Sequence, residues 1–161
     1  ILICLQRNGG WSMGGIPTQQ WITRTIAHIR RITVRDIIVR GHPGDKTTLH
    51  ELKVNMFPRV TKQTPEEISL RKQLARSWCT ITYISSPGVA SLLYGTPVFV
   101  TDPIPERSQW FPICNTDLND IESPKAYDRT DWYHKLAQFH WTTAEVKNGN
   151  AWRFIRERLP T

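Results

Sequence analysis

Short apolar runs alternate with longer amphipathic or charged segments along the first two thirds of the chain. Four of these runs predict buried strands: residues 1–5, 36–40, 80–84 and 97–101. Three intervening segments predict helices from the spacing of apolar residues or the order of charges: residues 18–31, 65–75 and 89–94. Uniformly apolar strands separated by helices are typical of a parallel sheet covered on both faces. We therefore predict an α/β fold with an open, mostly parallel, Rossmann-like sheet.

The last part of the chain has a different character. Residues 103–127 are rich in Pro and Asp and predict a loop, and two helices are expected near residues 128–139 and 143–158. A chain of 161 residues and 18.7 kDa fits one domain. We expect residues 1–102 to form its core, and residues 103–161 to form a loop and helical C-terminal extension packed on that core.

Positive charge is concentrated in the first half of the chain. The formal net charge is +7, and residues 1–76 contain 13 Lys or Arg against 5 Asp or Glu. A field of this sign attracts an anionic partner such as a nucleotide phosphate, a nucleic acid or an acidic membrane surface. Charge alone does not choose among these partners, and a solvated basic face explains it equally well.

Other compositional signals narrow the class of protein. No apolar run approaches the ~18 residues that a membrane span needs, so we expect no span. The three cysteines, Cys4, Cys79 and Cys114, form no C-x-x-C pair. This spacing argues against a zinc finger and against a disulfide framework, and it favours a cytoplasmic location.

Ligands of open parallel sheets bind beyond the carboxyl ends of the strands. Four loops follow the predicted strands at this edge: residues 6–15, 41–46, 85–88 and 101–106. All four are rich in small, polar or charged residues. The sequence therefore predicts a ligand site at the carboxyl edge of the sheet.

Backbone amides and hydroxyls in two of these loops suit an oxyanion. Gly9 and Gly10 permit close backbone approach and expose N–H donors, although a merely flexible connection is the alternative. Ser85 and Ser86 directly precede a predicted helix, where one hydroxyl can cap the helix and the other can meet a phosphate. Gly88 has no side chain to obstruct that approach.

Cationic side chains gather at the loop after the second predicted strand. Arg40, His42 and Lys46 together can neutralise a phosphate. Pro43 biases His42 toward an extended conformation at the end of the strand. The alternative is that His42 is an ordinary surface residue.

The sequence lacks the motifs of several common nucleotide-binding sites and metal-dependent hydrolases. The sequence contains no G-x-G-x-x-G, G-K-[ST] or H-E-x-x-H. Asp128, Asp131 and His134 have a spacing that can be drawn as a metal cluster, but a solvated helix face is the better interpretation. We therefore expect neither a metal nor another cofactor.

Two motifs together resemble a known family. His42-Pro43 after a strand, followed about forty residues later by SSPGVASLLYGTPVFV at residues 85–100, resembles the donor-binding half of GT-B glycosyltransferases. The pattern is most similar to capsule polysaccharide biosynthesis proteins and Kdo-transferase-like enzymes. LQRNGGWS at residues 5–12 is similar to phage-encoded glycosyltransferase-like proteins. The resemblance covers residues 1–101 well, and the tail resembles only the phage-encoded proteins.

The resemblance implies that the substrate is a nucleotide-sugar donor. His42 and Pro43 would contact its phosphate and nucleoside, and the Ser85, Ser86 and Gly88 loop would hold phosphate at the helix start. The implied reaction is metal-independent transfer of the sugar to an acceptor.

The resemblance also assigns residues to the rest of the site. Gln6 and Arg7 would border an inter-domain cleft, and Asp102 or Glu106 would bind the ribose or the sugar. Enzymes of this type have two Rossmann-like domains, and this chain supplies one. An N-terminal acceptor domain carrying the general base is therefore expected outside this chain.

Other functions stay open. A phage DNA-modifying glycosyltransferase would combine sugar transfer with the basic first half, and its acceptor would be nucleic acid rather than polysaccharide. A basic nucleic-acid-binding module without catalysis, or a non-catalytic interaction domain, would explain the single Rossmann-like domain.

Overall fold

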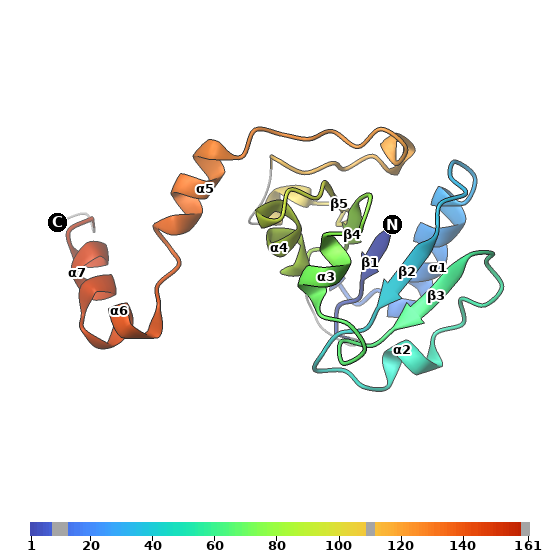
Figure 1. Ribbon diagram of the computed structural model, residues 1–161, viewed down its shortest axis with the longest axis horizontal. Helices are drawn as coiled ribbons and strands as arrows, with labels where there is room; N and C mark the ends of the chain where they lie inside the picture. Colours follow the sequence, from blue (N-terminus) through green and yellow to red (C-terminus); the bar gives the residue numbers. More distant parts are fainter. Residues whose placement is uncertain (8–12, 109–111, 159–161) are drawn as a thin grey trace. The chain divides into compact units, whose positions relative to one another are not determined.

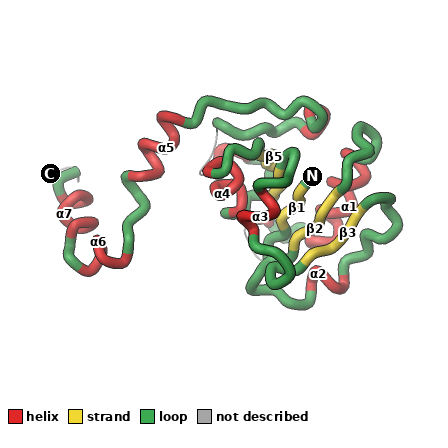
Figure 2. The backbone as a smooth tube through the Cα atoms, viewed as in Figure 1, coloured by secondary structure: helices red, strands yellow, loops and turns green. Residues whose placement is uncertain are grey.

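A computed structural model describes residues 1–7, 13–108 and 112–158 (Figures 1 and 2). Within these residues the backbone forms one sheet of five parallel strands in the order β3-β2-β1-β4-β5. The strands are β1 Leu2–Cys4, β2 Ile37–Arg40, β3 Val60–Gln63, β4 Thr80–Thr82 and β5 Val98–Val100. The predicted open, parallel, Rossmann-like α/β fold is confirmed.

The sheet is buried on both faces because apolar side chains point both ways along its central strands. In and beside β1, Ile3 and Leu5 belong to the larger core cluster, whereas Leu2 and Cys4 belong to a second cluster on the opposite face. This alternation follows from the two-residue period of a strand. An apolar run without polar interruptions is what such a doubly covered strand requires.

Helices cover the two faces separately. Helix α1 (Thr18–Ile29) packs its isoleucines into the larger cluster, and α3 (Leu70–Leu74) and α4 (Pro87–Leu93) cover the other face (Figure 1). Helix α4 ends in a Schellman motif, in which Thr96 N–H donates to Ser91 O at 2.9 Å and Gly95 N–H donates to Leu92 O at 3.1 Å. Gly95 has φ +80°, the left-handed conformation that this motif needs.

One predicted helix is shorter than expected, and two observed elements were not predicted. The 65–75 helix is reduced to the short α3, and the chain before it forms the one-turn helix α2 (Thr48–Glu51) and strand β3. Strand β3 is an edge strand of half-buried and exposed residues, so its VTKQ sequence lacks the apolar run that marks the other strands. Local pattern alone does not reveal such an edge strand.

The chain divides into two compact units, Ile1–Tyr127 and Asp128–Thr161. The first contains the sheet and the short 3₁₀ turns η2 (Pro105–Arg107) and η3 (Leu118–Asp120). The predicted extension 103–161 therefore divides, since residues 103–127 belong to the unit of the sheet. In the described part of the chain, no helix is long and apolar enough to cross a bilayer.

The second unit consists of helices α5 (Thr130–Ala137), α6 (Thr143–Lys147) and α7 (Asn150–Arg156). Gly149, at φ +79°, separates α6 from α7 and splits the single helix predicted over 143–158. Thr142 and Glu145 form a reciprocal capping box at the start of α6. The Trp141 and Phe154 rings pack edge to face with their centroids 5.1 Å apart.

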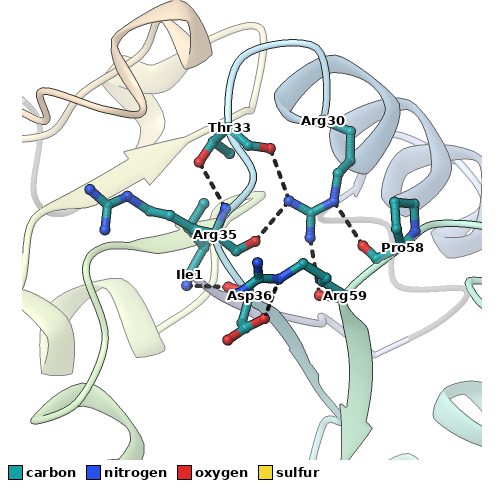
Figure 3. A network of polar contacts seen from close by, with 7 residues as sticks. All are labelled: Ile1, Arg30, Thr33, Arg35, Asp36, Pro58 and Arg59. Carbon is teal, nitrogen blue, oxygen red and sulfur yellow. Dashed lines mark hydrogen bonds and ion pairs between the residues drawn. The ribbon is translucent and has the colours of Figure 1, made fainter.

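The amino edge of the sheet is closed by the guanidinium of Arg30 (Figure 3). Its nitrogens donate to the carbonyl oxygens of Thr33, Arg35, Pro58 and Arg59 at 2.8–3.1 Å. One side chain thus joins the loop before β2 to the loop before β3. Part of the positive charge in the first half of the sequence is therefore structural.

Candidate functional site

The strand order places a topological switch point beside β1. From β1 the chain proceeds to β2 on one side, and it later returns to place β4 on the other side. Loops that leave neighbouring strands in opposite directions open a crevice at the carboxyl edge. Because adjacent strands lie about 4.8 Å apart, the ends of β2 and β4 are about 10 Å apart across β1.

A pocket of about 140 Å³ lies at the carboxyl ends of β2 and β3. It is lined by Gly41, His42, Pro43, Asp45, Lys46, Leu49, His50, Thr64, Pro65 and Glu66. The structure thus brings together three residues that the sequence analysis singled out, His42, Pro43 and Lys46. Apolar proline side chains and cationic or polar side chains line the same concavity, a combination typical of sites for small ligands.

The imidazole of His42 is held by its own loop. Its Nδ1 accepts the backbone N–H of Gly44 at 3.0 Å. A Cβ added at Gly44 would lie 3.3 Å from the His42 Cε1, so glycine permits this close approach. Because Nδ1 is an acceptor, the neutral ring carries its proton on Nε2. Among the described residues, Nε2 has no hydrogen-bond partner, which leaves a positioned donor at the pocket.

The backbone around α2, which supplies other lining residues, is also held in place. The Asp45 carboxylate accepts the backbone N–H of Thr48 at 3.1 Å and its hydroxyl at 2.7 Å, which holds the start of α2. The Lys62 ammonium of β3 donates to the carbonyl oxygens of His50 and Leu52 at 2.9 and 2.8 Å, which holds the end of α2. The pocket is therefore formed by ordered backbone rather than by a free loop.

Arg40 does not contribute to this pocket. It is buried at the end of β2, and its Nη1 donates to Ile68 O at 2.7 Å and to the Gln73 side-chain oxygen. Burial lowers the pKa of its guanidinium. Arg40, which the sequence analysis expected to bind a phosphate, is instead a structural cation that joins β2 to the segment around α3.

The Ser85-Ser86 loop also differs from its prediction. The Ser85 hydroxyl lies 2.7 Å from that of Thr82, and the Ser86 side chain makes no capping bond. The amides of Gly88 and Val89 donate to the carbonyl oxygens of Ser85 and Ser86. The expected group of free amides at the start of α4 is therefore not formed, and the exposed Ser86 hydroxyl is what this loop presents to solvent.

The remaining candidates are spread along the same edge. Gln6 is buried, and its Oε1 accepts the N–H of Ile84 at 2.7 Å, which ties the ends of β1 and β4 together. Arg7 is exposed beside it, whereas Gly9 and Gly10 lie outside the described residues.

The loop after β5 contains the two acidic candidates. The Asp102 carboxylate is fully buried, accepts Ile104 N–H at 2.8 Å and pairs with Arg107. These contacts within the loop after β5 give Asp102 a structural role there. Glu106 is exposed one residue before Arg107.

Sequence reasoning missed part of the pocket. His50, Thr64, Pro65 and Glu66 line it; His50 is placed by the one-turn helix α2, and the other three follow β3, which carries no apolar signal. Within residues 1–7, 13–108 and 112–158, no three His, Cys, Asp or Glu side chains are grouped to hold a metal ion. The buried thiols of Cys4 and Cys79 have pKa values raised by burial to about 12, which makes them poor nucleophiles.

Comparison of the chain with protein-family models, with curated proteins and with solved structures finds no match.

Proposed function

We propose that this chain is the donor-binding domain of a GT-B-type glycosyltransferase, which holds the phosphates of a nucleotide-sugar at the carboxyl edge of its sheet. The observation that carries the proposal is the Nε2 of His42, which has no hydrogen-bond partner in the part of the chain that the structure describes, on a residue that lines the pocket of β2 and β3. The switch point of the Rossmann-like sheet lies between β1 and β4, on the same carboxyl edge as this pocket, which is consistent with a nucleotide ligand along that edge.

In this proposal, different residues of the carboxyl edge bind different parts of the nucleotide-sugar. His42 Nε2–H donates to a phosphate oxygen, and the nearby Lys46 ammonium adds a second positive charge at the pocket. Pro43 and Pro65 offer apolar surface for the nucleoside. Across β1, the exposed Ser86 hydroxyl is available to a second phosphate, since the two strand ends are about 10 Å apart.

In this proposal, the protein promotes sugar transfer electrostatically. Charge develops on the leaving nucleotide phosphate as the glycosidic bond breaks, and positioned donors and cations stabilise that charge. His42 and Lys46 supply this stabilisation without a metal ion. The acceptor and the general base that deprotonates it are assigned to a partner domain.

The test is isothermal titration calorimetry of the chain with CMP, UDP, GDP and ADP, followed by the His42→Ala variant. Loss of one charge-assisted hydrogen bond, about 1.5–3 kcal/mol, predicts ten- to hundredfold weaker binding. The melting temperature should change little, because His42 is partly exposed and packs little. His28→Ala at the opposite edge of the sheet is the matched control and should bind as the wild type does.

The proposal is wrong if no nucleotide of the panel binds, or if His42→Ala binds as tightly as the wild type. A large loss of stability in His42→Ala with unchanged affinity would make the residue structural.

A further inference from the structure

A second positively charged surface lies on the face of the sheet that α3 and α4 cover (Figure 1). We define it as the α3–α4 surface, which consists of Arg71, Lys72, Arg76, Leu93 and Tyr94. All five residues are exposed, and Leu93 and Tyr94 are each 50% exposed. None of them lines the pocket of β2 and β3.

The backbone beneath this surface is rigid. The Ser69 hydroxyl accepts Lys72 N–H and caps α3, while Leu70 and Leu74 anchor α3 to the apolar cluster on that face. The buried Thr96 hydroxyl donates to Leu74 O at 3.0 Å, which joins the end of α3 to the turn after α4. The backbone that carries the three cations and Tyr94 is thus held in place.

The charges of this surface are not neutralised by the protein itself. In the part of the chain that the structure describes, no carboxylate forms an ion pair with Arg71, Lys72 or Arg76. The Arg71 guanidinium lies 5.9 Å from the centre of the Tyr94 ring. Elsewhere arginines do have carboxylate partners, as Arg35 has with Glu122 and Arg59 has with Asp36.

The residues of this surface suit a single-stranded nucleic acid better than a duplex or a lipid bilayer. Cations beside a half-exposed aromatic ring suit a phosphodiester backbone whose bases are free to stack. Helix α3 has five residues and lies on the sheet, so it does not project into a duplex groove. Leu93 is the one exposed aliphatic side chain of the surface, which is little apolar area for insertion into a lipid bilayer.

We infer that the α3–α4 surface binds single-stranded nucleic acid, with Arg71, Lys72 and Arg76 on phosphates and Tyr94 stacked on a base. This function is separate from nucleotide binding at the pocket of His42 and does not depend on it.

The experiment measures fluorescence anisotropy of a labelled oligothymidine with the full chain at salt concentrations from about 20 to 200 mM. Three phosphate contacts predict a slope of log K against log salt of about −2 for a single strand. Lys72→Ala and Arg76→Ala should each reduce the magnitude of that slope by about 0.7. Tyr94→Ala should weaken binding about tenfold, whereas Tyr94→Phe retains the ring and should bind as the wild type does.

Arg24→Ala is the matched control, because Arg24 is an exposed arginine of α1 on the opposite face of the sheet. It removes the same charge and should leave both the affinity and the slope unchanged. The inference is overturned if Arg24→Ala weakens binding as much as Arg76→Ala, if a duplex or an anionic vesicle binds as tightly as the single strand, or if nothing binds at low salt.

Discussion

Replacement of Arg40 by methionine tests whether this arginine stabilises the fold or binds the ligand. Arg40 is 8% exposed, and its Nη1 donates to the carbonyl of Ile68 and to the side chain of Gln73. Methionine fills much of the same volume but donates no hydrogen bond. The substitution therefore leaves the Ile68 carbonyl and the buried Gln73 side-chain oxygen without this donor, and the Gln73 amide keeps its bond to Gln63 at 2.6 Å.

The expected loss of stability follows from these contacts. A hydrogen bond to a charged group contributes about 1.5–3 kcal/mol, so two contribute about 3–6 kcal/mol. Removal of the buried guanidinium also removes its desolvation cost, which opposes part of this loss. We expect the free energy of unfolding to fall by about 2–4 kcal/mol, which corresponds to a decrease in Tm of roughly 10 °C for a protein of this size.

Urea titration followed by circular dichroism and tryptophan fluorescence measures this free energy. Arg24→Met, which alters an exposed arginine of α1, should change it by less than about 0.5 kcal/mol. Nucleotide affinity of folded Arg40→Met should stay within about twofold of the wild type. A variant with unchanged stability and lost nucleotide affinity would refute this reasoning and restore Arg40 to the ligand site.

Two further predictions concern the backbone and the buried thiols. Gly95→Ala places a side chain at φ +80° in the turn after α4 and should lower the free energy of unfolding by about 1–2 kcal/mol, seen as a lower urea midpoint; an unchanged midpoint would contradict it. Burial raises the pKa of Cys4 and Cys79 to about 12. Above about pH 9 the unfolded chain releases thiol protons that the folded chain retains. The free energy of unfolding should therefore fall as the pH rises from about 9 to 12. Urea titrations at pH 8 and pH 10 check this, and the Cys79→Ala variant should show a smaller decrease than the wild type.

The predicted α/β class was determined by local patterns. The apolar residues at the centre of runs such as 36–40 and 97–101 form most of β2 and β5, whose side chains are largely buried. The same patterns missed β3, whose side chains are half-buried or exposed and which therefore carries no apolar run.

The candidate site was determined only in part by sequence. His42, Pro43 and Lys46 are neighbours in the chain, so their meeting at one pocket follows from a short loop after β2. His50 and Glu66 reach the same pocket through α2 and the segment after β3, which no local motif encodes.

Tertiary structure alone decided what the polar side chains of the carboxyl edge do. Arg40 meets Ile68 and Gln73, and Gln6 meets Ile84, across separations of 28, 33 and 78 residues. A sequence motif specifies which donors and acceptors a loop carries, but burial requires each of them to find a partner. Packing of distant segments supplied partners to Arg40 and Gln6, and left the Nε2 of His42, a residue that lines the pocket, without a hydrogen-bond partner among the described residues.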